Sequence, residues 1–216
     1  MKKVVGIFGG SFNPVHRGHI MLAQYLSQHS HLDEVWLTLS PQNPFKVSKE
    51  LLDDNHRLSM LQLATDGIDG VEVCDIELSM PRPSYTINTL ERLSQEYPQY
   101  QFNIVIGGDN WNLFDKWKDY SRIINEYGVV VYPRPGYELN TIGDANVVFV
   151  DAPLADVSST EIRNSIANGK DVEELLPQGV WEYIKEILRN GISIYDLPLR
   201  VCYYARVSTD HEEQVS

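Results

Sequence analysis

Residues 4–19 read Val-Val-Gly-Ile-Phe-Gly-Gly-Ser-Phe-Asn-Pro-Val-His-Arg-Gly-His, a short apolar run that passes into a glycine-containing loop. An apolar run of this length, bounded by glycine, is typical of a strand that is buried on both faces, as in a parallel sheet. Residues 19–28 then carry apolar side chains at helical spacing, at Ile20, Leu22, Ala23 and Leu26. A strand, a loop and a helix in this order predict the start of a βαβ unit.

The same alternation continues along the chain. Further strands are predicted at 34–39, 71–76, 101–106, 128–132 and 146–150, and further helices at 55–64, 84–97, 121–126, 159–168 and 173–190. Such alternation predicts an α/β fold with a doubly wound, mostly parallel, Rossmann-like sheet. Ligands of these sheets bind beyond the carboxyl ends of the strands, so the segments that follow the strands are where function is expected. We expect one domain over residues 1–190.

The composition limits the possible partners. The chain has 216 residues and a formal net charge of −12, so its surface repels nucleic acid and anionic membranes. Its two cysteines, Cys74 and Cys202, stand in no zinc-binding spacing, and no apolar run approaches the length of a membrane span. The apolar run near the N-terminus is too short for the core of a signal peptide. We therefore expect a cytoplasmic protein with no metal ligands of its own, no nucleic-acid partner and no membrane segment.

The loop after the first strand carries residues suited to binding phosphate. Gly9 and Gly10 let the backbone approach a ligand closely, and the helix that follows offers unpaired N–H groups. His16 and His19 are three residues apart, which places both imidazoles on one face of a helix start. Each residue alone also fits a structural role. Together, after a strand, they favour a site that donates hydrogen bonds to phosphate oxygens.

Residues 157–163 form a second candidate anion site. Val-Ser-Ser-Thr-Glu-Ile-Arg begins with the serine, threonine and glutamate that are typical of a helix start. With the N-cap at Ser159, Arg163 lies one turn later on the same face, beside the free N–H groups of the helix end. Capping alone accounts for the serines, but it does not account for the arginine.

These two stretches resemble the motifs of the nucleotidyltransferase superfamily. Residues 9–19 are similar to its phosphate loop, GGxFxPxHxGH, and residues 157–163 to its (I/V)SSTxIR motif. The resemblance implies a Rossmann-like sheet, no covalent intermediate, and attack of an acceptor phosphate on the α-phosphorus of ATP, with Mg²⁺ leaving on pyrophosphate. It implies that His16, His19 and Arg163 stabilise the transition state. It also implies contacts with ATP from Gly9, Gly10, Ser11, Phe12, Gly18, Gly107, Asp109, Arg134, Ser158, Ser159 and Thr160.

Three segments between the motifs resemble the nicotinate branch of the superfamily. Residues 83–90 are similar to its SYT-xx-TL segment, which implies that Thr86 receives the nicotinate carboxylate. The stretch from Gly107 to Trp117 is similar to its G-x-D…W segment, which implies stacking of Trp117 on the pyridine ring, while Trp111 is expected in the core. Lys46 matches a basic residue near the acceptor phosphate. Nicotinate mononucleotide is the expected acceptor; nicotinamide mononucleotide, phosphopantetheine and a non-catalytic nucleotide-binding regulator are the alternatives.

Two features depart from this pattern. Asn13 stands where many members of the superfamily carry aspartate, and it is similar in shape but uncharged. Residues 191–216 do not belong to the motif pattern, and residues 200–214 resemble the first strand and nucleophile loop of serine recombinases, with Ser208 at the nucleophile position. So short a segment cannot build a recombinase core. We expect an extraneous tail without recombinase activity.

Overall fold

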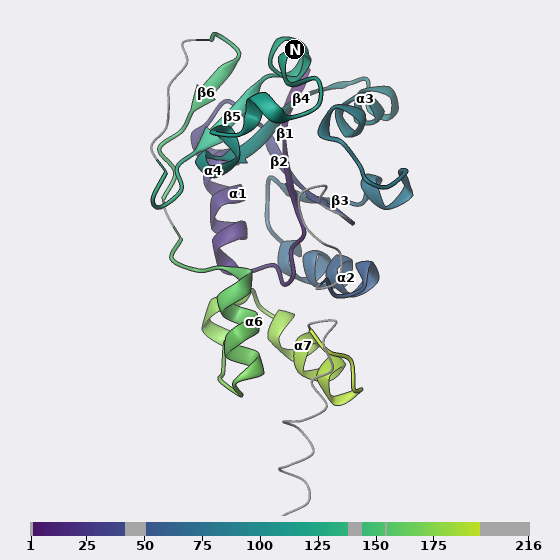
Figure 1. Ribbon diagram of the computed structural model, residues 1–216, viewed down its shortest axis with the longest axis vertical. Helices are drawn as coiled ribbons and strands as arrows, with labels where there is room; N and C mark the ends of the chain where they lie inside the picture. The colour runs from purple at the N-terminus through teal and green to yellow at the C-terminus, as the bar shows by residue number, and fades with distance from the viewer. Residues whose placement is uncertain (1, 42–50, 138–143, 154, 195–216) are drawn as a thin grey trace, which may run out of the picture.

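The computed structural model describes residues 2–41, 51–137, 144–153 and 155–194. Within them, six parallel strands form one sheet in the order β3-β2-β1-β4-β5-β6 (Figure 1). The strands are β1 (Lys3–Gly10), β2 (Glu34–Leu39), β3 (Val71–Cys74), β4 (Tyr100–Gly107), β5 (Val129–Tyr132) and β6 (Val147–Phe149). The order reverses beside β1, as a doubly wound sheet requires. The predicted fold class is confirmed.

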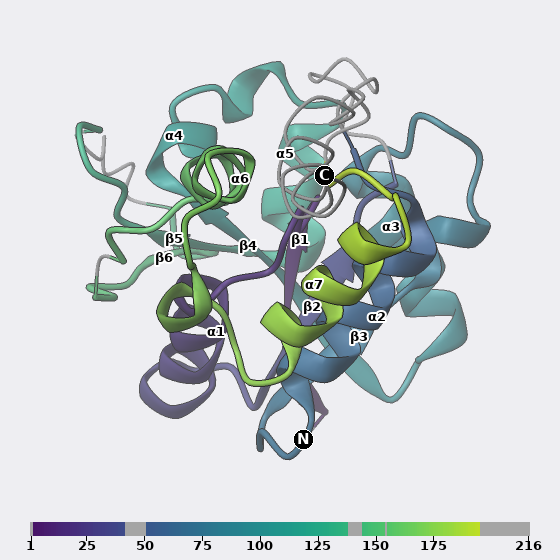
Figure 2. The ribbon, with the colours of Figure 1, turned by 90° about the horizontal axis from the view of Figure 1, so that it is seen from below.

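The helices lie in two layers and at one end of the sheet (Figure 2). They are α1 (Arg17–His29), α2 (Asp54–Thr65), α3 (Thr86–Glu96), α4 (Gly108–Trp111), α5 (Tyr120–Arg122), α6 (Ser159–Ala167) and α7 (Val180–Arg189). Shorter turns are η2 (Ile76–Ser79), η3 (Phe114–Lys116), η4 (Ile123–Tyr127) and η5 (Glu173–Leu175). No helix in the described part of the chain is long and apolar enough to cross a bilayer.

The prediction of one helix over 173–190 is wrong. The chain forms the short turn η5, runs through Pro177, and starts α7 only after Gly179. Gly179 has a φ of 80°, in the left-handed region that favours glycine. The residues on both sides of this break are amphipathic, so the hydrophobic pattern alone does not reveal it.

Two apolar cores cover the two faces of the sheet. On one face, Ala23 and Leu26 of α1 and Met60 and Leu61 of α2 are buried against the strands. On the other face, α3 contributes the buried side chains Ile87, Leu90 and Leu93. Because alternate residues of each strand enter opposite cores, the central strands carry the nearly continuous apolar runs seen in the sequence.

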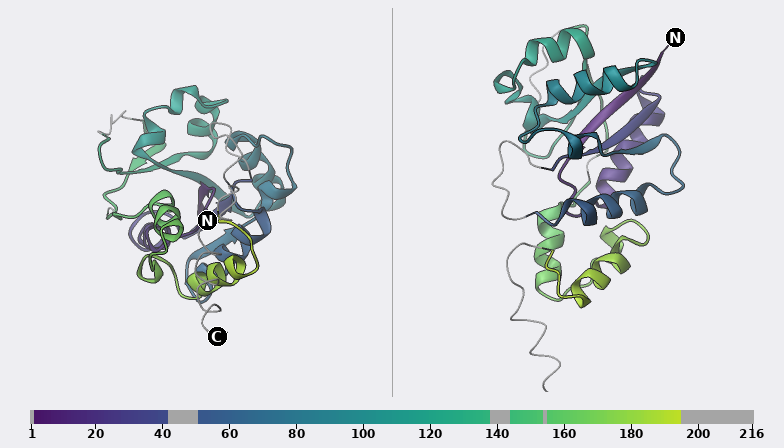
Figure 3. Two further views of the ribbon diagram at one scale, coloured as in Figure 1. Left: turned by 60° about the horizontal axis from the view of Figure 1, so that its bottom comes forward. Right: turned by 90° about the vertical axis from the view of Figure 1, so that its right-hand side faces the viewer.

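The carboxyl ends of the strands point toward α6 and α7 (Figure 3). In the right-hand panel α6 and α7 lie beyond the end of the sheet, and α7 packs on α2, where Tyr183 Oη is 2.8 Å from His56 Nδ1. Arg17, at the start of α1, donates from Nε to the carbonyl of Leu176 at 2.8 Å. Ile194 is fully buried in the core that α1 and α2 form on one face of the sheet. The residues after it, including the recombinase-like segment, lie outside the described residues.

Candidate active site

The loop between β1 and α1 brings two histidine rings together. His16 is the N-cap of α1 and His19 lies in its first turn; their rings are stacked with centroids 3.6 Å apart and planes at 26°. The backbone N–H of His16 donates to Nδ1 of His19 at 3.2 Å. Phe12, which adopts a φ of 43° and is buried, packs edge-on against the His19 ring at 5.0 Å. The predicted sharing of one face by the two imidazoles is confirmed.

Both imidazoles are neutral at physiological pH. Desolvation, followed by the charge of Arg134, lowers the pKa of His16 from 6.5 to about 4. Desolvation, followed by His16 and Arg134, holds the pKa of His19 well below 6.5. Since Nδ1 of His19 accepts a hydrogen bond, the proton of its neutral ring is on Nε2. His19 is therefore a neutral donor through Nε2.

Helix α6 docks directly on this loop. Ser159 donates from Oγ to the carbonyl of Pro14 at 2.9 Å, and Arg163 donates from Nη1 to the carbonyl of Asn13 at 2.7 Å. Thr160 lies beside the same guanidinium, with its Oγ1 3.4 Å from Nη2. Two motifs separated by about 140 residues in the sequence are thus joined by hydrogen bonds.

The predicted cap of this helix is off by one residue. Ser158, not Ser159, is the N-cap, and it forms a capping box with Glu161. Its Oγ accepts from the backbone N–H of Glu161 at 3.2 Å, while its own N–H donates to the Glu161 carboxylate at 3.1 Å. The shift releases the Ser159 hydroxyl from capping, so that it bonds to the loop instead.

Gly18 permits a close approach between α1 and the segment before α6 that contains Ala155 and Val157. A Cβ at this position would lie 2.7 Å from Ala155 Cβ and 2.9 Å from Val157 Cγ1. Real Cβ atoms do not come this close to other carbons, so a larger residue here would push the two motifs apart. The glycine therefore has a packing role at the site in addition to its place in the sequence motif.

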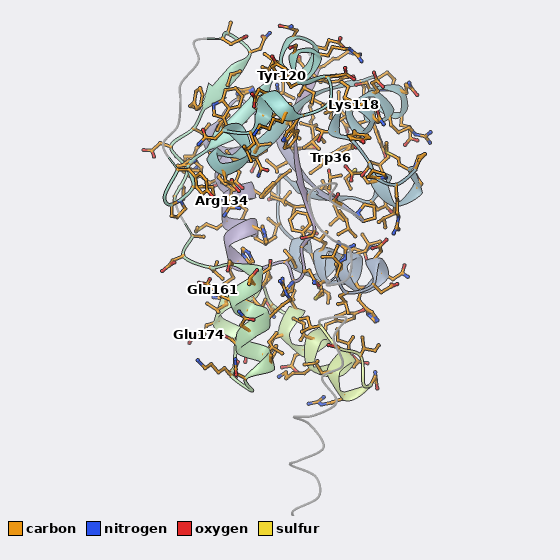
Figure 4. All side chains as sticks on the ribbon, viewed as in Figure 1. Trp36, Lys118, Tyr120, Arg134, Glu161 and Glu174 are labelled. Atoms are coloured by element: carbon orange, nitrogen blue, oxygen red, sulfur yellow. The ribbon has the colours of Figure 1, made fainter. Side chains whose placement is uncertain are left out.

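The ends of β4 and β5 supply a further charged pair. Asp109, in the first turn of α4, lies with Oδ1 3.7 Å from Nε of Arg134, which also sits over the Tyr132 ring at 5.3 Å. A Cβ at Gly107 would lie 2.5 Å from Oδ1 of Asp109 and 2.9 Å from Cγ of Arg134, so a larger residue there would displace these side chains. Figure 4 shows Arg134 just above α6, on which Glu161 is labelled.

The described surface includes a smaller and a larger hollow. The smaller one, of about 30 Å³, is lined by both histidines, Gly18 and Arg134 among other residues. A larger one of about 670 Å³ runs along β2, β3 and η2 and contains none of the predicted site residues. The histidine hollow is the one at the carboxyl ends of the strands, where this fold places ligands. No group of three or more His, Cys, Asp or Glu side chains in the described ranges is placed to hold a metal ion.

The two predicted acceptor segments are neighbours. Thr86 is the first residue of α3, with Tyr85 at the N-cap. Trp117 is half-buried, with its ring 5.1 Å from that of Phe114. Lys118, next to Trp117, lies over the ring of Tyr85 at 4.9 Å. As expected, Trp111 is a core residue, with 6% of its surface exposed. Lys46 lies outside the described residues.

Known proteins carry the same sequence pattern over most of this chain. A family model described as "Cytidylyltransferase-like" matches residues 7–165. A protein of Bacteroides thetaiotaomicron named "Probable nicotinate-nucleotide adenylyltransferase" is 46% identical over 193 residues, which cover 89% of this chain and 96% of that protein. The chain belongs to the nicotinate-nucleotide adenylyltransferase family.

Further proteins named as nicotinate-nucleotide or nicotinic acid mononucleotide adenylyltransferases are similar to this chain. A Flavobacterium johnsoniae protein of the same name is 40% identical over 183 residues, covering 83% of this chain and 95% of its own. The solved structure of Plasmodium falciparum nicotinic acid mononucleotide adenylyltransferase complexed with NaAD aligns with a TM-score of 0.69 at 19% identity, over 87% of this chain and 98% of that one. At that identity the structural likeness supports the fold.

Two buried charged residues of this adenylyltransferase escaped the sequence prediction. Arg57, in α2, is fully buried, and its guanidinium bonds to the carbonyls of Ser11 and Ser40. Glu77, in η2, is 8% exposed and accepts hydrogen bonds from three hydroxyl groups. In the sequence both look like ordinary surface charges, because their partners are far away along the chain.

Proposed function

We propose that this adenylyltransferase transfers the AMP group of ATP to nicotinate mononucleotide and releases pyrophosphate. A phosphate oxygen of the acceptor forms a bond to the α-phosphorus, and the bond from that phosphorus to the oxygen bridging it to the β-phosphate breaks. The product is nicotinate adenine dinucleotide. Besides family membership, one observation supports this chemistry most: α6 is hydrogen-bonded to the phosphate loop through Ser159 and Arg163, beside the stacked histidines.

In this proposal the histidines act as neutral hydrogen-bond donors. In-line transfer moves negative charge onto the phosphoryl oxygens and the leaving pyrophosphate, so donors that are already oriented lower the barrier. His19 is oriented by the hydrogen bond at its Nδ1 and by packing against Phe12, which leaves the Nε2–H for a phosphate oxygen. His16 is held against it by stacking. Neither ring needs to gain or lose a proton during the reaction.

Positive charge comes from two arginines and one helix end. Arg163 is fixed to the loop through one Nη atom, and the free N–H groups at the start of α6 add the positive end of a helix dipole. Arg134, which follows β5, lines the same hollow as the two histidines. We propose that ATP lies between the two arginines. Its further contacts are with Gly9, Gly10, Ser11, Phe12, Gly18, Gly107, Asp109, Ser158 and Thr160.

Mg²⁺ bound to ATP would supply positive charge that shields the phosphate groups, and in this proposal it is part of the substrate rather than held by side chains of the protein. Asn13, which stands where many members of the superfamily carry aspartate, is fully buried and uncharged. In this proposal the protein's task is to hold the ATP phosphates while the ion shields them.

The acceptor is recognised at the start of α3. The backbone N–H groups of the first turn of this 11-residue helix point outward from its N-terminus, where a carboxylate is favoured. We assign the nicotinate carboxylate to Thr86 and these N–H groups, and stacking of the pyridine ring to Trp117. Lys46 completes the assignment near the acceptor phosphate. A neutral carboxamide would gain less from a helix N-terminus than a carboxylate does, which favours the acid.

The test is pyrophosphate release with ATP, Mg²⁺ and one acceptor at a time: nicotinate mononucleotide, nicotinamide mononucleotide or phosphopantetheine. Strong preference for nicotinate mononucleotide supports the proposal, and preference for another acceptor overturns it. His19→Ala should lower turnover by about 10²–10³-fold, the usual effect of removing one transition-state donor. His29→Ala, at the exposed far end of the same helix, is the matched control and should leave turnover unchanged.

A further inference from the structure

We infer that Arg57 and Glu77 are positioning residues that fix the phosphate loop relative to the acceptor segment through Ser40. The phosphate loop is residues 9–19 and the acceptor segment is residues 83–90. The inference rests on the proposed function, since it assigns these two segments to ATP and to the acceptor. The residues that join the two segments, called the Ser40 network below, are Ser40, Arg57, Glu77, Ser84 and Thr89.

Arg57 forms one end of the network. Its side chain is fully buried in α2, and its guanidinium uses all three nitrogens. Nη1 donates to the carbonyl of Ser11 at 2.6 Å and to that of Ser40 at 3.0 Å, while Nε donates to the carbonyl of Leu52 at 2.9 Å. Nη2 pairs with Asp54. One rigid planar group therefore links the phosphate loop to the segment that follows β2.

Ser40 is the crossing point. Its backbone N–H donates to the carbonyl of Gly10 at 2.9 Å, and its carbonyl accepts from Arg57. Its hydroxyl donates to Oε2 of Glu77 at 3.0 Å. All three polar groups of this residue are used, two toward the side of the phosphate loop and one toward the acceptor segment.

Glu77 forms the other end. Its buried carboxylate accepts from Ser84 Oγ at 2.8 Å and from Thr89 Oγ1 at 2.9 Å, in addition to Ser40. Ser84 and Thr89 lie on either side of Thr86, the residue assigned to the acceptor. A buried carboxylate whose donors all come from side-chain hydroxyls holds them firmly, because moving them would leave the charge unpaired in the interior.

A second, outer link runs in parallel. Asp54 pairs with Arg57 through one oxygen and with Nη2 of Arg82 through the other, at 2.6 Å. Arg82 immediately precedes the acceptor segment, and half of its side chain is exposed. The phosphate loop and the acceptor segment are thus connected twice, once through buried groups and once near the surface.

The consequence concerns turnover more than binding. In-line transfer requires the acceptor oxygen, the α-phosphorus and the leaving oxygen to align, and a misplacement of about 1 Å costs on the order of 10²-fold in rate. A network that sets the spacing between the two substrates should affect this alignment, while each substrate alone still finds its own contacts. We therefore expect kcat to fall while the affinity of each substrate measured separately changes little.

The test uses Arg57→Lys, Glu77→Gln and Ser40→Ala in the full chain. Lysine keeps the charge but cannot reach three carbonyls in fork geometry, so kcat should fall by about 10–100-fold. Glu77→Gln and Ser40→Ala each remove fewer hydrogen bonds of the network than Arg57→Lys does, so kcat should fall by about 3–10-fold. The dissociation constants of ATP and of nicotinate mononucleotide, each titrated alone, should stay within about threefold of wild type. The stoichiometry of ATP binding corrects kcat for any unfolded fraction.

The double variant Arg57→Lys with Glu77→Gln tests whether the two residues act together. If they do, the kcat of the double variant should be well above the value expected from multiplying the fold-decreases of the two single variants. Asn103→Ala is the matched control: Asn103 is a buried polar residue at the other end of the sheet, and it donates to the carbonyl of Tyr127 at 2.6 Å. It should lower stability without lowering the corrected kcat.

The outcomes separate the two proposals. If the wild-type protein does not use nicotinate mononucleotide, the proposed function fails. If the wild type is active but corrected kcat stays within twofold in Glu77→Gln and Ser40→Ala, the positioning role is refuted. It is also refuted if the fold-decreases in kcat of the two single variants simply multiply in the double variant. A decrease in corrected kcat in Asn103→Ala as large as in the network variants would refute it as well. Should Arg57→Lys fail to fold, Ser40→Ala and Glu77→Gln still decide the question.

Discussion

The stability of this adenylyltransferase should fall in mild acid because of His16. The ring is buried, and desolvation and the charge of Arg134 both lower its pKa. In the unfolded chain the same ring is hydrated and titrates near 6.5. Between the two pKa values the unfolded state binds a proton that the folded state does not. Lowering the pH through this window therefore favours unfolding.

The size of the effect follows from the shift. With a folded-state pKa of about 4 and an unfolded value of 6.5, lowering the pH from 7 to 5 costs about 2 kcal/mol of folding free energy. For a protein of this length that corresponds to a decrease of about 4–8 °C in Tm. Above pH 7 the contribution is constant, since the ring is neutral in both states. His19 has a pKa lowered in the same direction and adds to the loss with the same sign.

The measurement compares wild type with His16→Gln by urea unfolding at intervals between pH 5 and pH 8. Glutamine keeps a polar side chain but does not titrate, so the variant should lose about 2 kcal/mol less than wild type over this range. The absolute stability of the variant is irrelevant, because only the difference in pH dependence is compared. Parallel curves for the two proteins would refute the assignment of a buried, neutral His16.

Three further changes test other parts of the molecule. Gly18→Ala places a Cβ 2.7 Å from that of Ala155; it should cost about 1–3 kcal/mol and reduce turnover, and an unchanged urea midpoint would contradict the packing argument. Trp117→Ala should raise the KM for nicotinate mononucleotide about tenfold or more, at unchanged KM for ATP, because it removes an aromatic stacking surface; equal changes in both would exclude a specific stacking role. Ending the chain after Ile194 should preserve Tm and activity, whereas ending it after Asn190 should cost about 2–5 kcal/mol, because Ile194 is fully buried; equal stability of the two truncated chains would place the domain boundary at residue 190.

The sheet could be predicted from the sequence because its strands are locally distinct. Residues 4–8 form a short apolar run next to glycine, and residues 101–106 are mainly apolar apart from Gln101 and Asn103; both stretches lie inside observed strands. Burial on both faces makes such runs mostly apolar, so the pattern is strong within a few residues. The third strand was predicted two residues too long: β3 ends at Cys74, and Ile76 begins the turn η2. Its apolar side chain is buried in either conformation, so hydrophobicity could not place the boundary.

The site was predictable only where its chemistry is local. His16 and His19 are three residues apart, so helix geometry alone brings their rings together. The contact between Arg163 and the carbonyl of Asn13 joins residues 150 positions apart, and the family resemblance, which implied contacts of both motifs with ATP, did not predict it. Arg57 and Glu77 had neither kind of signal. Their burial depends on partners that tertiary packing delivers, including Ser11 and Ser84.

The net charge explains why these contacts should matter so much. A chain with a formal charge of −12 repels ATP at long range, so the bulk electrostatic field does not assist binding. The two histidines at the site are neutral and add no attraction at a distance. Under the proposed function, affinity for phosphate would then come from groups within hydrogen-bond reach, for which we propose Arg163, Arg134 and the backbone N–H groups of the loop and of α6. Short-range contacts of this kind depend on placement to within about an ångström, which is why buried residues that only position the loop should show in the rate.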